Sequence, residues 1–103
     1  MIVVVTEEFG VERVIRLDDP DNFTELAVDV VGLSRDELDA VAGADGAGFV
    51  EGDHLWIDVD FLRSRGRGTV QWNAGFAAMI AYARGKGWTD ADGTRVRAHI
   101  RCG

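Results

Sequence analysis

Two segments of this chain alternate strictly between apolar and polar residues, and this pattern constrains the fold more than any other. In residues 54–59, Leu55, Ile57 and Val59 alternate with His54, Trp56 and Asp58. In residues 94–102, Val96, Ala98, Ile100 and Cys102 alternate with Arg95, Arg97, His99 and Arg101. Successive side chains of a strand point to opposite faces of its sheet. Both segments are therefore predicted to be strands of a sheet with one covered and one open face.

Further strands are predicted from β-branched runs and turn residues. Residues 2–6 and 11–17 favour a hairpin with its turn at 7–10. Residues 49–51 are predicted to pair with 54–59 across the two-residue turn Gly52-Asp53. Together with residues 94–102, these segments make a sheet of about five strands.

Helices are predicted where a capping residue precedes a periodic apolar stripe. Asn22 with Glu25, and Ser34 with Glu37, match the capping-box pattern and predict helices over 22–31 and 34–43. A longer helix is predicted over 70–84 with Thr69 as its cap, and a short helical turn over 61–65 with Asp60 as its cap. Glycine inside a helix costs about 1 kcal/mol, so Gly75 is expected to have a packing role.

The resulting order is ββααββ(α)αβ. At 103 residues the chain is the size of one domain. We expect a single α+β domain with a mostly antiparallel sheet of about five strands and helices packed on one face. The alternative is a winged-helix fold with residues 35–42 as its recognition helix. That helix carries Asp36, Glu37 and Asp39, which DNA phosphates would repel.

Composition excludes several classes of protein. A single cysteine, Cys102, allows neither an intramolecular disulfide nor a cysteine-rich zinc site, and is expected to be incidental. No apolar run is long enough to span a membrane, and the apolar start has no basic flank, so we expect a cytoplasmic protein. The net charge of −7 is unevenly distributed. Residues 1–62 hold 16 acidic and 3 basic side chains, whereas residues 63–103 hold 2 acidic and 8 basic ones.

The polar sides of the two alternating segments supply the candidate site. If these strands are neighbours, their polar side chains share one face of the sheet. His54 or His99 would then serve as a general base near neutral pH, with Asp58 or Asp60 orienting it or acting as the acid. Arg97 and Arg101 would bind a carboxylate or phosphate, and Trp56 would form an aromatic wall. The alternative is a solvated face with cross-strand ion pairs.

Two functions remain open on this pattern. The first is a binding or accessory module that holds a protein partner or a small anionic molecule, with a homodimer among the candidate assemblies. The second is a small enzyme of the isomerase, cyclase or lyase type that uses no organic cofactor. The same histidines and aspartates could hold a metal ion, but no paired-histidine helix motif supports one, so no metal is expected. Nucleic acid is an unfavourable partner because the basic run 63–68 lacks aromatic residues.

Overall fold

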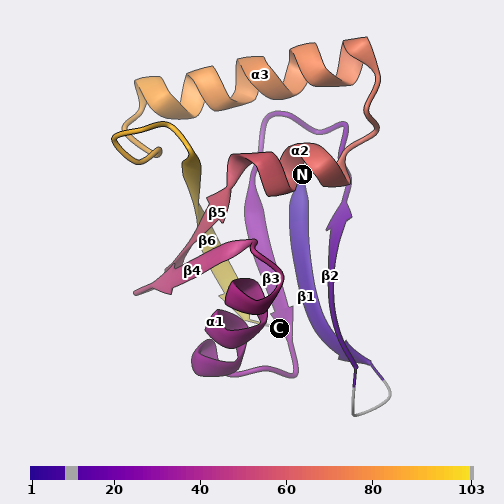
Figure 1. Cartoon of the computed structure of the whole chain (residues 1–103), viewed down its shortest axis with the longest axis vertical. Helices are drawn as coiled ribbons and strands as arrows, with labels where there is room; N and C mark the ends of the chain where they lie inside the picture. Colours follow the sequence, from indigo (N-terminus) through magenta and orange to yellow (C-terminus); the bar gives the residue numbers. More distant parts are fainter. Residues whose placement is uncertain (9–11, 103) are drawn as a thin grey trace.

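The computed structural model describes residues 1–8 and 12–102 of the chain (Figure 1). Its elements are β1 (Ile2–Glu8), β2 (Glu12–Asp18), β3 (Ala27–Val31), α1 (Arg35–Ala44), β4 (Gly48–Glu51), β5 (His54–Asp58), α2 (Val59–Arg65), α3 (Val70–Gly85) and β6 (Arg95–Cys102). The middle of the predicted turn at 7–10 and the predicted strand start at Val11 lie outside the described residues, as does the side chain of Cys102.

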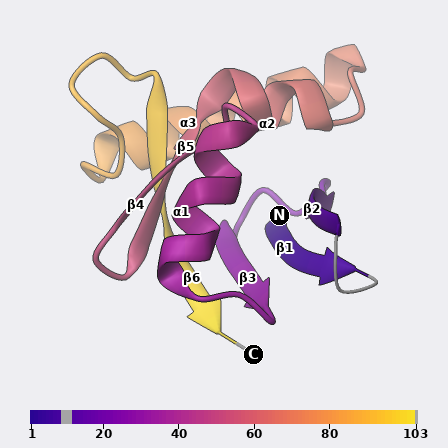
Figure 2. The same cartoon turned by 60° about the horizontal axis from the view of Figure 1, so that its bottom comes forward.

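The six strands form one mixed sheet in the order β2-β1-β3-β6-β5-β4. β1 pairs with β3 and β3 pairs with β6 in parallel, while the outer pairs β1–β2, β5–β6 and β4–β5 are antiparallel. The sheet curls into a half-barrel, and α1 lies in its hollow (Figure 2). α3 crosses one end of the half-barrel, above α2 and the connection between β2 and β3 (Figure 1). The α+β class is confirmed, but the sheet is larger and more mixed than predicted.

The main correction concerns residues 22–31, which were predicted to form a helix. Residues 27–31 are instead the strand β3, which pairs on both sides and occupies the centre of the sheet. Its valines alternate, with Val28 and Val30 buried in the core. Asn22 accepts hydrogen bonds from the backbone and hydroxyl of Thr24, which fixes a local turn. Because two flanking strands satisfy the backbone of β3, this segment is stable as a strand.

The other predicted elements are observed, with small shifts at their ends. The capping box of Ser34 and Glu37 is present at the start of α1, and the Thr69 side chain caps α3. α2 begins at Val59 rather than at residue 61, because the Asp58 side chain accepts from the backbone N–H groups of Asp60 and Phe61. The predicted cap of α2 is therefore wrong by two residues.

Three contacts involve aromatic side chains at the first half of helix α3. Trp72 and Phe76 stack with ring centroids 5.0 Å apart, and the Trp72 indole donates to the Pro20 carbonyl at 2.8 Å. Phe23 lies against Gly75 so tightly that a Cβ there would meet the Phe23 ring at 2.4 Å. Gly75 therefore has the packing role predicted for it, and the segment before β3 is held against α3.

Candidate functional site

The alternating strands are neighbours in the sheet, as the candidate site requires. β5 and β6 pair in antiparallel register with His54 opposite His99 and Trp56 opposite Arg97. The two imidazole rings meet edge to face, with centroids 5.5 Å apart. His54 is half-buried, whereas Arg97 and His99 are exposed. The apolar sides of both strands point into the core, so the histidines and Arg97 share the outer face.

These residues line a depression that we call the Arg97 hollow. Its walls are Leu26, His54, Trp88, Arg97 and His99, and its volume is about 280 Å³. The connection from α3 to β6 brings Trp88 into place: the Trp88 N–H donates to the Ala83 carbonyl, and its own carbonyl accepts from the Arg97 N–H at 2.7 Å. Trp88 therefore lies beside Arg97 and supplies the aromatic wall of the hollow.

A second cavity of about 90 Å³ adjoins the hollow and is mainly apolar. It lies between the second half of α3, residues 23–26 and the start of β6, and its walls include Phe23, Met79, Ile80, Ala83 and Val96. We call it the apolar cavity. Leu26, Trp88 and Arg97 line both spaces. Arg97 therefore lies where the polar Arg97 hollow meets the apolar cavity.

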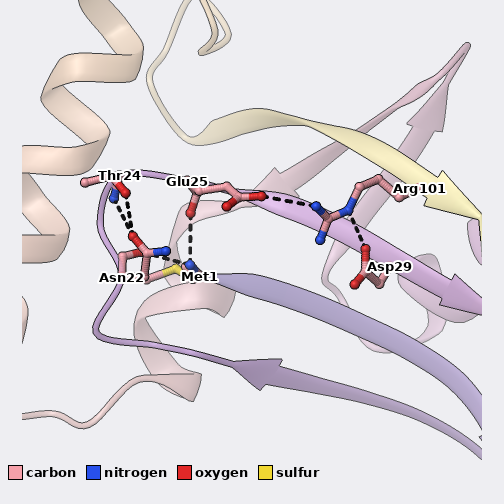
Figure 3. A network of polar contacts seen from close by, with 6 residues as sticks. All are labelled: Met1, Asn22, Thr24, Glu25, Asp29 and Arg101. Atoms are coloured by element: carbon pink, nitrogen blue, oxygen red, sulfur yellow. Dashed lines mark hydrogen bonds and ion pairs between the residues drawn. The ribbon is translucent and has the colours of Figure 1, made fainter.

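A polar network holds the wall formed by residues 22–26 in place (Figure 3). The Met1 ammonium donates to the Asn22 carbonyl at 2.8 Å and to the Glu25 carbonyl at 2.9 Å. Burial lowers the pKa of this ammonium, an effect that Asp19 and Glu25 oppose through their negative charge. These bonds tie the segment to Met1, directly before β1, while Phe23 of the same segment packs against Gly75 of α3.

The same network neutralises Arg101. Its guanidinium donates to Asp29 at 2.6 Å and to Glu25 at 3.1 Å (Figure 3). The hydrogen bond to Asp29 raises the pKa of Arg101 above its ordinary value, and Glu25 adds to this effect. Arg97 forms no ion pair with any carboxylate of the described part of the chain. Of the two arginines predicted to bind an anion, Arg97 keeps its charge available.

The predicted aspartates lie away from the histidines. Asp58 is opposite Arg95 in the sheet, and its side chain caps the start of α2. Asp60 is on α2, exposed, and pairs with Arg63. Among the side chains that the structure describes, no carboxylate is hydrogen-bonded to His54 or His99. The structure therefore brings together the histidines and Arg97 but not an aspartate–histidine pair.

Trp56 also takes a different place from the one predicted. It lies opposite Arg97, but its indole N–H donates to Glu51 at 3.3 Å and it does not line the Arg97 hollow. Trp88 takes that role, and sequence reasoning missed it because its segment forms only a bridge beside β6. The sequence did contain one indication of this role: Trp88 directly follows Gly85 and Gly87, the glycines predicted to end the long helix.

The described part of the chain contains neither a metal-binding cluster nor a membrane-spanning helix. No group of three or more histidine, cysteine, aspartate or glutamate side chains there lies close enough to hold a metal ion. No helix there is long and apolar enough to cross a membrane. No protein-family model, curated protein or solved structure matches the chain. Its function is therefore inferred from the residues of the hollow.

Proposed function

We propose that this protein is a binding module for a small anionic molecule and that the anion sits in the Arg97 hollow. The observation that supports this most is the contrast in charge between Arg97 and Arg101 on the same strand. Arg101 is neutralised by two carboxylates, whereas Arg97 forms no ion pair within the described residues and lines a depression. An arginine that lines a depression and lacks a carboxylate partner attracts an anion from solution.

The chemistry of the hollow suits a carboxylate or a phosphate. The planar guanidinium of Arg97 can donate two parallel hydrogen bonds to such a group. The imidazoles of His54 and His99 face the same depression and offer further N–H donors. Trp88 and Leu26 shield one side from water. A hydrogen bond to a charged group contributes about 1.5–3 kcal/mol, so a bare anion is expected to bind in the millimolar range.

The acid–base enzyme has less support. A histidine acting as a general base is normally oriented by a partner on its second nitrogen, and neither aspartate takes that role here. Asp58 caps α2, and Asp60 pairs with Arg63. The histidines contact each other instead. They are better suited to donate hydrogen bonds to a bound anion.

Self-association through the sheet edges also has less support. On the outer strand β4, the Val50 N–H donates to the Asp39 side chain at 2.9 Å. On the outer strand β2, the Ile15 carbonyl accepts from Arg65 at 3.4 Å. Open edges allow sheets to join through their backbones. Helical side chains occupy part of both edges here, which leaves less backbone for a second copy to pair with.

The test compares two variants that remove the same charge. Inorganic phosphate and acetate are titrated into the ¹⁵N-labelled protein at low salt, and amide shifts of Trp88, Arg97 and His99 are followed. Arg97→Gln is expected to weaken binding about tenfold or more, whereas Arg101→Gln changes it less than about twofold. Equal losses in both variants, or no shift at these amides in the native protein, would show that the proposal is wrong.

A further inference from the structure

We infer that the anion is the head group of an amphipathic organic acid whose short hydrocarbon group enters the apolar cavity; this inference rests on the proposed function. The first observation is continuity. The Arg97 hollow and the apolar cavity share Leu26, Trp88 and Arg97 as walls. A molecule bound to the Arg97 guanidinium therefore has two directions open to it, outward to solvent or inward along Leu26.

The walls of the apolar cavity identify what lies in the inward direction. Ile80, Ala83 and Val96 are buried and carry no polar side-chain atom. Glu25 is the carboxylate among the walls, and its side chain already accepts from Arg101. A second charged group of the ligand would find no free partner there. Burying an unpaired charge is costly, so the inner part of the ligand is expected to be hydrocarbon.

The size of the apolar cavity limits that hydrocarbon group. A cavity of ~150 Å³ with aliphatic and aromatic walls holds one benzene ring, and the apolar cavity here has about 90 Å³. A branched chain of three or four carbons fits this space better than an aromatic ring. Longer groups have one further route, because an open groove beside Phe23, Gly75 and Tyr82 continues from the cavity along α3.

The charges around the hollow favour one anionic group over two. Arg101 is already paired, and Arg95 is shared between the Asp90 carboxylate at 4.0 Å and the ring of Phe49. Arg97 is left as the guanidinium that faces the hollow. A branched-chain monocarboxylate matches one guanidinium and one short apolar cavity. A polyphosphate or dicarboxylate would place a second charge where no free guanidinium faces it.

The experiment is a titration with acids of increasing chain length. Acetate, propionate, isobutyrate and isovalerate are compared by the same amide shifts. Burying one methylene contributes enough free energy for about a fourfold change in Kd. We expect Kd to fall about threefold to fourfold per carbon up to isovalerate. Isovaleramide, which has the same chain without the charge, is expected to bind at least about tenfold more weakly than isovalerate.

Substitutions in the cavity wall locate the chain. Ala83→Leu fills the apolar cavity and is expected to abolish the gain from acetate to isovalerate while acetate still binds. Ala81→Leu adds the same atoms on the exposed side of the same helix and is the matched control. If Ala83→Leu does not fold, Met79→Ala enlarges the space and is expected to extend the gain to longer acids. Loss of the gain in Ala81→Leu would contradict the assignment.

The outcomes separate this inference from the function on which it rests. Equal affinity for acetate and isovalerate, with both weakened by Arg97→Gln, would overturn the amphipathic ligand and keep the anion site. If Arg97→Gln weakens none of the acids, or if isovaleramide binds as tightly as isovalerate, the anion site is overturned and the inference that rests on it falls with it, even where affinity still rises with chain length. Absence of binding by every acid would overturn both.

Discussion

Arg97 and Arg101 lie on the same strand and the same face of the sheet, but the regions around them differ in what surrounds the charge. At Arg101 the neighbouring strand β3 supplies Asp29, directly opposite in the parallel register, and the segment before β3 supplies Glu25. At Arg97 the neighbours are Trp56 on β5 and Trp88, whose backbone carbonyl accepts from the Arg97 N–H. The charge of Arg101 is paired with two carboxylates. The charge of Arg97 has no carboxylate partner in the described part of the chain, and its neighbours are aromatic.

The difference shows how the uneven charge of the chain is resolved in three dimensions. The basic C-terminal part is partly neutralised by the acidic N-terminal part, through Arg101 with Asp29 and Arg67 with Asp21. This neutralisation depends on where the acidic residues fall in the sheet register. It does not reach Arg97, because the parallel pairing of β3 with β6 begins with Ala27 opposite His99 and β3 has no residue before Ala27 to lie opposite Arg97.

The largest expected effect comes from giving Arg97 the carboxylate that Arg101 already has. Leu26 lines the Arg97 hollow one residue after Glu25. Leu26→Glu is expected to pair with Arg97 and to reduce the affinity for acetate at least about tenfold, since the anion must displace a tethered carboxylate. Leu26→Gln is the matched control because it makes the same change of shape without charge. Amide-shift titration measures both, and equal losses would show that the apolar contact of Leu26 matters rather than charge.

An intermediate effect is expected from the opposite change, which frees Arg101. The double variant Glu25→Gln, Asp29→Asn removes both of its partners. Affinity for a dianion such as phosphate is expected to rise severalfold and to become more sensitive to salt, since a second unscreened cation then faces the same side of the sheet. Acetate affinity should change less.

The control for this double variant is Asp21→Asn, which frees Arg67; neither Asp21 nor Arg67 lines the Arg97 hollow. It alters the net charge of the protein in the same direction. If phosphate affinity rises as much in Asp21→Asn as in the double variant, the gain comes from overall charge. The distinction between the two regions of β6 would then lose its support.

The comparison also shows which features were predictable from sequence. Strict alternation in β5 and β6 predicted the shared polar face, because alternation reports on side-chain direction directly. It did not predict which polar residues would meet. Asp58 was assigned to the site, yet its position at the end of β5 lets it cap α2. Trp88 was missed because its place beside Arg97 depends on backbone bonds between distant segments.

The error at residues 22–31 has the same physical origin. Asn22 with Glu25 and Ser34 with Glu37 look alike as sequence patterns, but only the second pair forms a capping box. Val30 and Val31 fit the predicted helix stripe but also suit a strand. The pairing of β3 with β1 on one side and with β6 on the other decides in favour of the strand. Because no helix forms there, the Glu25 side chain does not cap a helix and accepts a hydrogen bond from Arg101 instead.

The smallest expected effect tests this contrast between the two glutamates. The Glu37 carboxylate accepts from the Ser34 backbone N–H at 3.0 Å, and this hydrogen bond lowers the pKa of Glu37 below its ordinary value of 4.5. A lowered pKa in the folded state means that the carboxylate stabilises the fold above the ordinary pKa. This contribution is lost as the pH falls through the lowered value.

Glu37→Gln keeps an acceptor for the Ser34 N–H but removes the charge. The variant is expected to have a slightly lower urea midpoint than the native protein at neutral pH, and the two midpoints should converge in acid. Glu25→Gln provides the comparison, because Glu25 supports Arg101 and caps no helix. A gap between Glu37→Gln and the native protein that stays constant or widens on acidification would contradict the charged cap. The charge of Glu37 would then not stabilise the start of α1. The two glutamates would differ only in their hydrogen-bond partners, which are the Ser34 N–H for Glu37 and Arg101 for Glu25.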